Sequence, residues 1–254
     1  MKFNDLDARL RVFETAHDHC ALPGLYLVAR LDGRGFTRLT KEVHPFEAPF
    51  DVRMRDYMAE TTRHLLECGF RIVYGYTQSD EISLLLHPSE DSFGRKLRKY
   101  TSVLAGEASA KFSLLLGDIG VFDCRISQLP RRENVVDYFR WRQEDAGRNS
   151  LNAHCYWLLR KQGRTVAEAT AQVKGQRTAT KHDLLFAHGI NYNELPSWQK
   201  RGLGIYWEDY LKDGFNPYTQ EPVHTLRRRL AVNLELPLGD SYAGFIRNLL
   251  PAAD

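Results

Sequence analysis

The chain has 254 residues, of which 43% are hydrophobic and 26% are charged, with a net charge of +3. A chain of this length and composition can bury a substantial core, which excludes intrinsically disordered and fibrous proteins. No apolar run reaches about 18 residues and the polar N-terminus has no apolar signal core, so we expect a cytoplasmic protein without a membrane span. The four cysteines show no Cys-x-x-Cys spacing, which favours buried thiols over a disulfide framework or a zinc site.

The first half of the chain predicts alternating helices and strands. A polar helix is expected within residues 1–20 and a loop over 37–50. Asp51 is the expected N-cap of a helix that Gly69 ends, and Ser92 that of a helix ending near Gly117. Four short apolar runs predict strands, the middle two joined as a β-hairpin by a polar turn; these strands are 25–32, 71–77, 81–87 and 121–129.

The resulting order, β-α-β-β-α-β, predicts an α+β fold with a ferredoxin-like antiparallel sheet and two helices behind it. In this topology the strand that ends at Asp32 lies beside the hairpin turn that carries Asp80. Paired carboxylates at such a position are typical of the palm domain of polymerases and nucleotidyl cyclases, where acidic residues hold two metal ions. We therefore expect a palm-like catalytic domain over residues 1–130.

Residues 131–254 predict a helical, basic extension packed on the palm-like domain. Helical patterns cover 133–162, 165–174 and 179–187, and an expected strand at 203–207 with a return strand near 222–235 predicts a second β-hairpin. Residues 131–190 hold eleven Lys/Arg against six Asp/Glu, a net charge of +5, which leaves −2 for the rest of the chain. A polyanion partner would explain this segment, although an uneven surface charge without a partner is equally compatible.

The candidate catalytic residues are Asp32, Asp80 and Glu81. Asp32 is followed by Gly33-Arg34-Gly35, where glycines allow backbone N–H groups to approach phosphate oxygens. Because the expected ligands are oxygens, magnesium suits the site better than zinc. Taken separately, each motif is compatible with an ordinary solvated turn; the predicted topology, which brings Asp32 and Asp80 together, favours the metal site.

Two further basic stretches are candidates for contact with phosphates. One opens the second palm helix with Arg95, Lys96, Arg98 and Lys99, where a clamp on a triphosphate or an RNA end competes with a plain solvated helix face. The other interleaves aromatic residues with arginines over residues 138–143, which favours base stacking on RNA about as much as a core position for the aromatic residues. The candidate RNA-binding residues are Arg131, Arg132, Arg140, Arg142, Arg148, Asn149 and Lys181.

Several spaced motifs together resemble the tRNA-histidine guanylyltransferase family, over about residues 20–205. They are Arg30-Leu31-Asp32-Gly33-Arg34-Gly35-Phe36, Tyr76-Thr77-Gln78-Ser79-Asp80-Glu81, Phe122-Asp123-Cys124-Arg125, Trp141-Arg142-Gln143 and Gly189-Ile190-Asn191-Tyr192-Asn193. The resemblance implies nucleotide addition in the 3′-to-5′ direction. A 5′-monophosphate RNA end is activated with ATP, or an existing 5′-triphosphate is used, and the 3′-hydroxyl of an incoming NTP, usually GTP, attacks the activated phosphate.

The resemblance also implies roles for individual residues. Two magnesium ions would be held by Asp32, Asp80 and the backbone carbonyl of Gly33, with Glu81 as a neighbouring acidic position. The implied nucleotide-binding residues are Asp32, Gly33, Arg34, Gly35, Phe36, Thr37, Ser79, Asp80, Arg95, Lys96 and Lys99. Members of the family tend to be tetramers, and the hairpin over 203–235 is a candidate subunit contact.

Three departures from the eukaryotic family pattern bear on the substrate. Where the eukaryotic proteins have His-Ile-Asn-Asn, this chain has Gly147-Arg148-Asn149-Ser150. It has Lys181-His182-Asp183 in place of Lys-Asn-Glu, and Ala48-Pro49 in place of Lys-Pro. These changes resemble the guanylyltransferase-like proteins of bacteria and archaea, which repair truncated tRNA 5′ ends by templated addition. We therefore expect tRNA, GTP and ATP as partners and templated repair as the activity. The alternatives are non-templated guanosine addition to histidine tRNA, a palm-fold nucleotide cyclase, and a non-catalytic RNA-binding module.

Overall fold

A six-stranded antiparallel sheet forms the centre of the molecule in a computed structural model that describes residues 2–216, 218 and 220–251. The strand order β4-β1-β3-β2-β5-β6 contains the expected ferredoxin-like core as its first four strands. This confirms the predicted α+β palm-like fold, and the strands are β1 Tyr26–Gly33, β2 Ile72–Gln78, β3 Glu81–Leu86, β4 Phe122–Leu129, β5 Leu203–Asn216 and β6 Glu221–Asn233.

Helices α3 (Val52–Glu67) and α4 (Leu97–Leu116) cover one face of the sheet. The Asp51 side chain accepts a hydrogen bond from the Arg53 backbone N–H at 2.7 Å, which confirms the predicted cap. The apolar side of each helix packs on alternate residues of β1 and β3, and these form the larger core together with a cluster of aromatic rings; its central side chains are Leu31, Phe36, Leu65, Ile82, Leu84, Leu104 and Phe112.

The opposite face is covered by α5 (Arg132–Lys161) and the C-terminal α9 (Gly239–Leu249). Side chains that alternate with those of the first core point to this side, because successive residues of a strand face opposite ways. Tyr74 of β2 and Tyr242 of α9 are fully buried there, with hydroxyl oxygens 3.1 Å apart, so one phenol donates a hydrogen bond to the other. The helix α9 was not predicted from the sequence.

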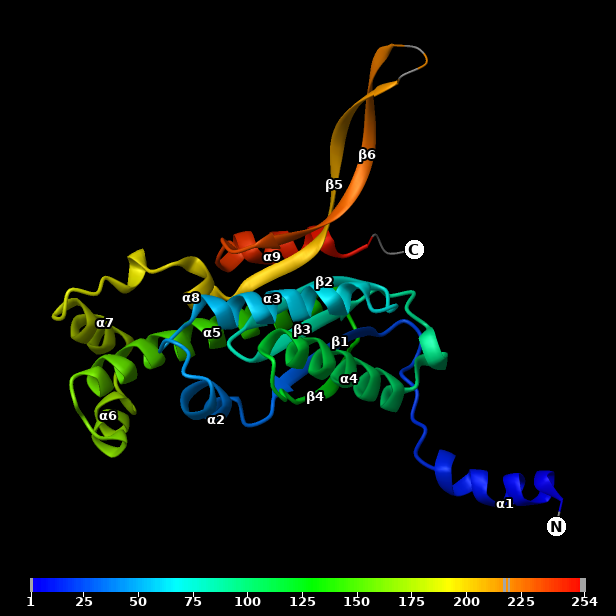
Figure 1. The fold of residues 1–254 in the computed structure, drawn as a ribbon, viewed down its shortest axis with the longest axis horizontal. Coiled ribbons are helices and arrows are strands. Elements are labelled where there is room, and N and C mark those ends of the chain that lie inside the picture. Colours follow the sequence, from blue (N-terminus) through cyan, green and yellow to red (C-terminus); the bar gives the residue numbers. More distant parts are fainter. Residues whose placement is uncertain (1, 217, 219, 252–254) are drawn as a thin grey trace.

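A smaller core joins the far end of α5 to α6 (Val166–Val173), α7 (Thr178–Phe186) and the turn at Tyr192–Glu194. This helical lobe lies at one end of the molecule (Figure 1), and the short α8 (Ser197–Arg201) leads from it back to the sheet. Strand β5 then pairs with β2, so the second half of the chain adds two strands to the sheet of the first. The boundary between residues 130 and 131 stays a prediction.

Three local expectations were wrong. Residues 37–50 are not a plain loop, because α2 (Phe36–Arg38) and a π-helical turn over Leu39–Val43 lie there. Ser92 does not cap α4; a 3₁₀ turn over Ser92–Arg95 intervenes, where Phe93 and Gly94 have positive φ angles, so the helix begins only at Leu97. The first strand of the second hairpin begins at Leu203 as expected but runs on to Asn216 instead of ending at residue 207, and the hairpin projects away from the body (Figure 1).

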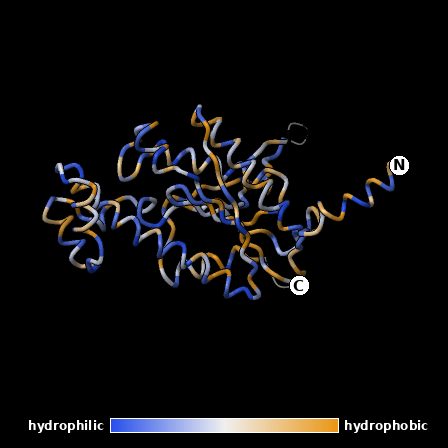
Figure 2. The backbone as a smooth tube through the Cα atoms, turned by 90° about the horizontal axis from the view of Figure 1, so that it is seen from below, coloured by the Kyte–Doolittle hydropathy of each residue, from blue (hydrophilic) through white to orange (hydrophobic). Residues whose placement is uncertain are grey.

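The N-terminal helix α1 (Phe3–Thr15) stands clear of the rest of the molecule in both views (Figures 1 and 2). It buries none of its side chains, although Phe3, Leu10 and Phe13 are among them. Within residues 2–216, 218 and 220–251, no helix combines the length and the apolar character needed to cross a bilayer.

Candidate active site

Asp32 and Asp80 are brought together at one end of the sheet. Asp32 is the penultimate residue of β1, and Ser79-Asp80 is the two-residue turn between β2 and β3, with Ser79 in the left-handed region at φ 55°. The backbone N–H of Gly33 donates to the Asp80 carbonyl at 3.1 Å, which ties the end of β1 to the turn. The predicted juxtaposition of the two carboxylates therefore holds in the structure.

The surroundings of Asp80 disfavour the charged form of its carboxyl group. Burial raises the pKa of the Asp80 carboxyl to about 6, and the negative charges of Asp32 and Glu81 act in the same direction. Asp32 is more open, with a side chain 35% exposed and an Arg125 guanidinium nitrogen 3.9 Å from its Oδ2. A divalent cation between the two carboxylates would relieve both the burial of charge and the repulsion.

The donor set at this point fits a hard cation that keeps part of its water shell. Across the part of the chain that the structure describes, no three His, Cys, Asp or Glu side chains converge as a ready-made metal cage. Asp32 and Asp80 supply two carboxylates, and the remaining ligands would be the Gly33 carbonyl, water and substrate phosphates. This is the usual manner in which proteins bind magnesium with phosphates.

Glu81 has a different position from the aspartate pair. Its Oε1 accepts from Arg30 Nη2 of β1 at 2.6 Å, and its Oε2 accepts from Arg142 of α5. Arg142 is only 6% exposed and also donates to Asp145 at 3.1 Å. The expectation that Arg142 faces RNA is therefore wrong: it is a buried ion-pair residue, and it fixes Glu81, the first residue of β3, against α5.

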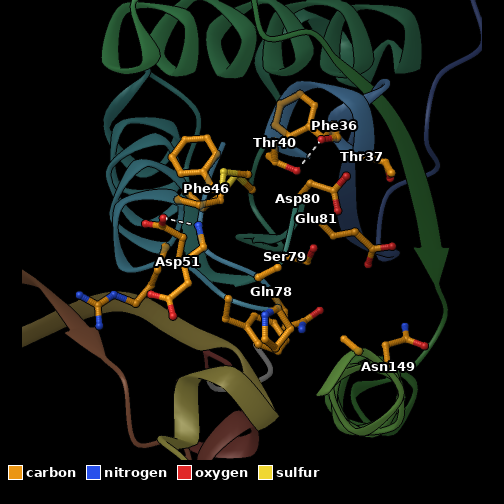
Figure 3. Close-up of a pocket in the computed structure, with 18 of the residues that line it drawn as sticks. Phe36, Thr37, Thr40, Phe46, Asp51, Gln78, Ser79, Asp80, Glu81 and Asn149 are labelled. Atoms are coloured by element: carbon orange, nitrogen blue, oxygen red, sulfur yellow. Dashed lines mark hydrogen bonds between the residues drawn. The ribbon is translucent and has the colours of Figure 1, made fainter. Parts of the chain in front are cut away.

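A pocket of about 300 Å³ opens beside the turn (Figure 3). Its walls come from the turn at residues 78–81, from α2 and the π-helical turn, from residues 46–58 and from α5. Of the predicted nucleotide-binding residues, Phe36, Thr37, Ser79 and Asp80 line it. Of the predicted RNA-binding residues, Asn149 does, from the facing side of α5. A nucleotide-sized ligand fits a pocket of this volume.

The side of the pocket away from Asp80 is aromatic and carries cations. Trp157 of α5 has the Lys41 ammonium 5.0 Å from its ring centroid, and Trp198 of α8 has the Arg55 guanidinium at the same distance. Phe50 packs edge-on against Trp198, with ring centroids 6.0 Å apart. Sequence reasoning missed this wall, because its members come from four separate segments whose meeting depends on the tertiary fold.

The loop after Asp32 is shaped by close packing. A Cβ placed on Gly33 would lie 2.6 Å from the Phe36 ring, so a glycine is required there. Phe36 is buried against Phe112 and Phe122, and Gly35 has a φ of 73° that favours glycine. Arg34 is exposed, and its backbone N–H donates to the Val121 carbonyl at 2.8 Å.

The basic start of α4 is occupied by contacts within the protein. The Arg95 guanidinium donates to five backbone carbonyls, so the expectation that Arg95 binds a triphosphate is replaced by a structural role; the acceptors are Ala21, Leu22, Leu25, Pro88 and Glu90. Lys96 pairs with Asp18 at 2.7 Å, and Arg98 pairs with the same carboxylate. Lys99 lies 5.4 Å from the Phe93 ring centroid, and none of these cations lines the pocket.

The predicted RNA-binding residues are spread over more than one surface. Arg132 donates to the carbonyls of Arg247, Leu250 and Pro251, so it anchors the C-terminal helix. Arg148 is 74% exposed and pairs with Asp145, to which Asn149 also donates. Arg131 is exposed at the start of α5, whereas Arg140 of α5 and Lys181 of α7 are half-buried.

A palm-like sheet with paired aspartates beside a nucleotide-sized pocket defines a palm-fold nucleotide enzyme. The chain matches the family model described as tRNAHis guanylyltransferase over residues 7–130, and the Thg1 C-terminal domain over residues 133–231. It therefore belongs to the tRNA(His) guanylyltransferase family.

Named relatives and solved structures agree with this family. The tRNA(His) guanylyltransferase of Schizosaccharomyces pombe is 35% identical over 71% of this chain and 73% of its own length. The probable tRNA(His) guanylyltransferase of Mus musculus is 32% identical over 78% of this chain and 70% of its own. A bacterial Thg1-like protein in complex with GTP has a TM-score of 0.76 at 28% identity and covers 96% of this chain and 98% of its own. A bacterial Thg1-like protein in complex with ATP has a TM-score of 0.75 at 28% identity and covers 96% of this chain and 99% of its own.

Proposed function

We propose that this chain adds nucleotides to the 5′ end of a tRNA in the 3′-to-5′ direction. The observation that carries the proposal is the Gly33 N–H to Asp80 carbonyl hydrogen bond, which holds Asp32 and Asp80 together beside the pocket. The naming of the relatives as tRNA(His) guanylyltransferases, and the GTP and ATP complexes of bacterial Thg1-like proteins, support nucleotide addition to tRNA as the reaction.

Each part of the site has a role in this reaction. The aromatic wall with Trp157 and Trp198 takes the nucleobase, and the polar side with Thr37 and Ser79 takes the sugar and phosphates. Asp32, Asp80 and the Gly33 carbonyl hold magnesium, and a count of two ions agrees with the requirement of phosphoryl transfer for charge at both the attacking and the leaving oxygen. When bound, the metal supplies positive charge that stabilises the phosphoryl transition state.

The reaction proceeds in two steps. The RNA 5′-monophosphate attacks the α-phosphate of ATP, an adenylylated 5′ end forms and pyrophosphate leaves. The 3′-hydroxyl of the incoming NTP then attacks the 5′ phosphorus, a phosphodiester forms and AMP leaves; when the RNA carries a 5′-triphosphate, pyrophosphate leaves instead. The protein residues orient the two reactants and exclude alternative geometries.

For the substrate, we propose templated repair of truncated tRNA. Residues 147–150, 181–183 and 48–49 depart from the eukaryotic motif and resemble guanylyltransferase-like proteins. Of the changed positions, Ala48 lines the pocket, so one departure reaches the place where we propose that the nucleotide binds; Asn149 and Pro49, which also line it, match the eukaryotic motif. Asp183 is exposed and Lys181 half-buried on α7, where the helical lobe would meet RNA.

The test of catalysis is nucleotide incorporation into a 5′-truncated tRNA transcript with labelled GTP, ATP and magnesium. Asp32→Asn and Asp80→Asn should abolish incorporation while tRNA binding, measured by filter retention, stays within about threefold. Asp91→Asn, which changes an exposed carboxylate outside the pocket, is the matched control and should retain full activity. Near wild-type turnover in either site variant would overturn the metal assignment.

Non-templated guanosine addition to histidine tRNA is the second candidate, because the curated relatives carry that name. Truncated transcripts that present C, A, G or U opposite the added position separate the two. Templated repair requires the incorporated nucleotide to follow the opposing base, whereas guanosine addition regardless of that base establishes the alternative. NTP turnover without RNA would indicate a cyclase, and binding of RNA without any incorporation a non-catalytic module. A cytoplasmic location and a tetrameric assembly stay predictions.

A further inference from the structure

The helix α1 is an exposed element without an intramolecular partner in the described part of the chain. It has 13 residues and buries no side chain. Isolated helices shorter than roughly 12–15 residues are marginal in water, because few hydrogen bonds offset the cost of nucleation. A helix of this length that carries five exposed large apolar side chains is therefore expected to gain stability from packing against another surface.

Four of those apolar side chains form one narrow stripe, and Val12, 58% exposed, lies outside it. Phe3, Leu6, Leu10 and Phe13 are separated by three, four and three residues, and they are 79%, 39%, 51% and 77% exposed. This spacing is that of the a and d positions of a coiled coil, with the two phenylalanines at the ends and the two leucines between them. Such a seam is matched by another helix with the same spacing more closely than by a flat surface.

The charges beside the seam identify the partner helix. With Phe3 at position a, the basic Arg9 is at g and the acidic Asp7 and Glu14 are at e; the basic Lys2 directly precedes the helix, where the preceding g position would fall. In a parallel pair each g residue meets an e residue of the next heptad, so Lys2 meets Asp7 and Arg9 meets Glu14 of the other helix. In an antiparallel pair g meets g and e meets e, which places like charges together.

We propose that α1 forms a short parallel coiled coil with α1 of a second copy of this chain. The intrahelical ion pair of Asp7 with Arg11, at 2.6 Å, engages one of the four charges and would be shared with Lys2 of the second copy. Neither Arg9 nor Glu14 forms an ion pair within 4.0 Å among the described residues, and Glu14 acts only at longer range on Arg11 and Arg98. The pair joins two protomers at their N-termini, away from the pocket (Figure 1).

Disulfide cross-linking tests the pairing and its direction. In a Cys20→Ser background, which removes the exposed native thiol, Phe13→Cys should give a disulfide-linked dimer under mild oxidation. In a parallel pair the two copies of position 13 face each other, whereas in an antiparallel pair they lie about 15 Å apart along the axis. Ala8→Cys, on the opposite side of the same helix, is the matched control and should stay monomeric on a non-reducing gel.

Charge reversal gives an independent readout. Arg9→Glu should weaken the cross-linked species of Phe13→Cys severalfold, and adding Glu14→Arg to it should restore the yield, because the pair is then complementary again. Loss without restoration, equal cross-linking of Ala8→Cys and Phe13→Cys, or no cross-link at Phe13→Cys would each overturn the proposal. If Phe13→Cys gives no cross-link and limited proteolysis shows that α1 of the monomer resists cleavage, the apolar seam packs on another part of the same chain.

A different occupant would also be visible. If α1 binds a lipid surface, Leu6→Ser with Leu10→Ser will release the protein from anionic phosphatidylserine vesicles in sedimentation while the Phe13→Cys cross-link is absent. The proposed pair predicts instead no vesicle binding and a loss of the cross-linked dimer in the same double variant. Light scattering of the full chain then reports whether the loss of this contact lowers the molar mass.

Discussion

Gly33 is the residue where the geometry of the site depends most directly on a missing side chain. Gly33→Ala would place a methyl group 2.6 Å from the Phe36 ring, which cannot move freely because it is buried against Phe112 and Phe122. We expect a destabilisation of about 1–3 kcal/mol from overpacking and a loss of nucleotide incorporation, since the loop holding Asp32 shifts. Chemical denaturation and the incorporation assay measure the two effects.

Gly106→Ala is the control for this change. Gly106 lies inside α4 with no atom within 4 Å of its would-be Cβ, so alanine there should leave activity unchanged and raise stability by up to about 1 kcal/mol through its better helix propensity. An active and fully stable Gly33→Ala protein would show that the Phe36 ring yields easily and that the loop tolerates a side chain.

Glu81 was predicted as a catalytic residue, and in the structure it forms ion pairs with Arg30 and Arg142. Glu81→Gln leaves the buried Arg142 guanidinium with only Asp145 as a charged partner, and breaking a buried pair costs about 3–5 kcal/mol when the other charge stays unpaired. We expect a loss toward the lower end of that range, measured as a shift in the urea midpoint. Arg148→Ala, which removes a 74% exposed partner of the same Asp145, should cost under about 1 kcal/mol.

Sequence reasoning identified some site residues and failed at others for physical reasons. Asp32 and Asp80 could be paired because strand adjacency in a ferredoxin-like sheet follows from element order. The predictions that Arg95 binds nucleotide and Arg142 binds RNA were wrong, because an arginine in a basic segment is expected to be exposed unless its hydrogen-bond acceptors are known. Three of the five acceptors of Arg95 are carbonyls 70 to 74 residues away, and Arg142 donates to a hairpin carboxylate 61 residues away, so only the tertiary fold reveals them.

At the scale of elements, α5 carries one wall of the pocket through a single row of side chains. Asn149, Ala153 and Trp157 recur every four residues, so they lie on one side of the helix and face the Ser79-Asp80 turn. Trp157→Ala should weaken nucleotide affinity by about 1–3 kcal/mol, the usual effect of removing an aromatic ring from beneath a base. Trp141→Ala is the control, since Trp141 is on the same helix, 54% exposed, and outside the pocket. Equal nucleotide affinities for the two variants would remove Trp157 from the site.

The contact of α5 with α8 contains a histidine that responds to pH. His154 is 9% exposed against Phe50 and Tyr192, and burial lowers its pKa from 6.5 to about 4. A lowered pKa means that the unfolded chain binds the proton more readily, so stability falls as pH decreases below 6.5 toward 4. The full effect is at most roughly 3 kcal/mol.

Denaturation curves of wild type and His154→Gln between pH 7 and pH 4 test this contribution. The variant should lose less stability than wild type over this interval, whereas His188→Gln, at an exposed position in the turn after α7, should follow wild type. Parallel pH profiles for wild type and His154→Gln would mean that His154 binds a proton as readily in the folded protein as in the unfolded chain.

On the scale of the whole molecule, the first 130 residues were the more predictable half. Their strands alternate apolar and polar residues or are buried on both faces, and capping residues such as Asp51 mark the helix ends. The second half follows different physics. Strands β5 and β6 extend past the body as a two-stranded ribbon with most residues exposed on both faces, so neither an apolar run nor a simple alternation marks their ends. The short α8 is fixed by contacts with α5 and β2, which no local pattern reports.

The distal part of this ribbon should be dispensable for folding. Only Leu203–Tyr206 of β5 pair with β2, and Tyr210 lies directly opposite Arg227. Replacing residues 211–226 by Asn-Gly, a turn that suits a two-residue hairpin, therefore removes no core residue among the positions of this segment that the structure describes. We expect the melting temperature to change by less than about 3 °C and nucleotide binding to be retained, because the pocket and all three cores lie elsewhere. A fall of 10 °C or more would show instead that the arm stabilises the fold. Light scattering would then compare the molar mass of the shortened protein with that of wild type, and a lower mass would mean that the arm stabilises through contact with a second copy.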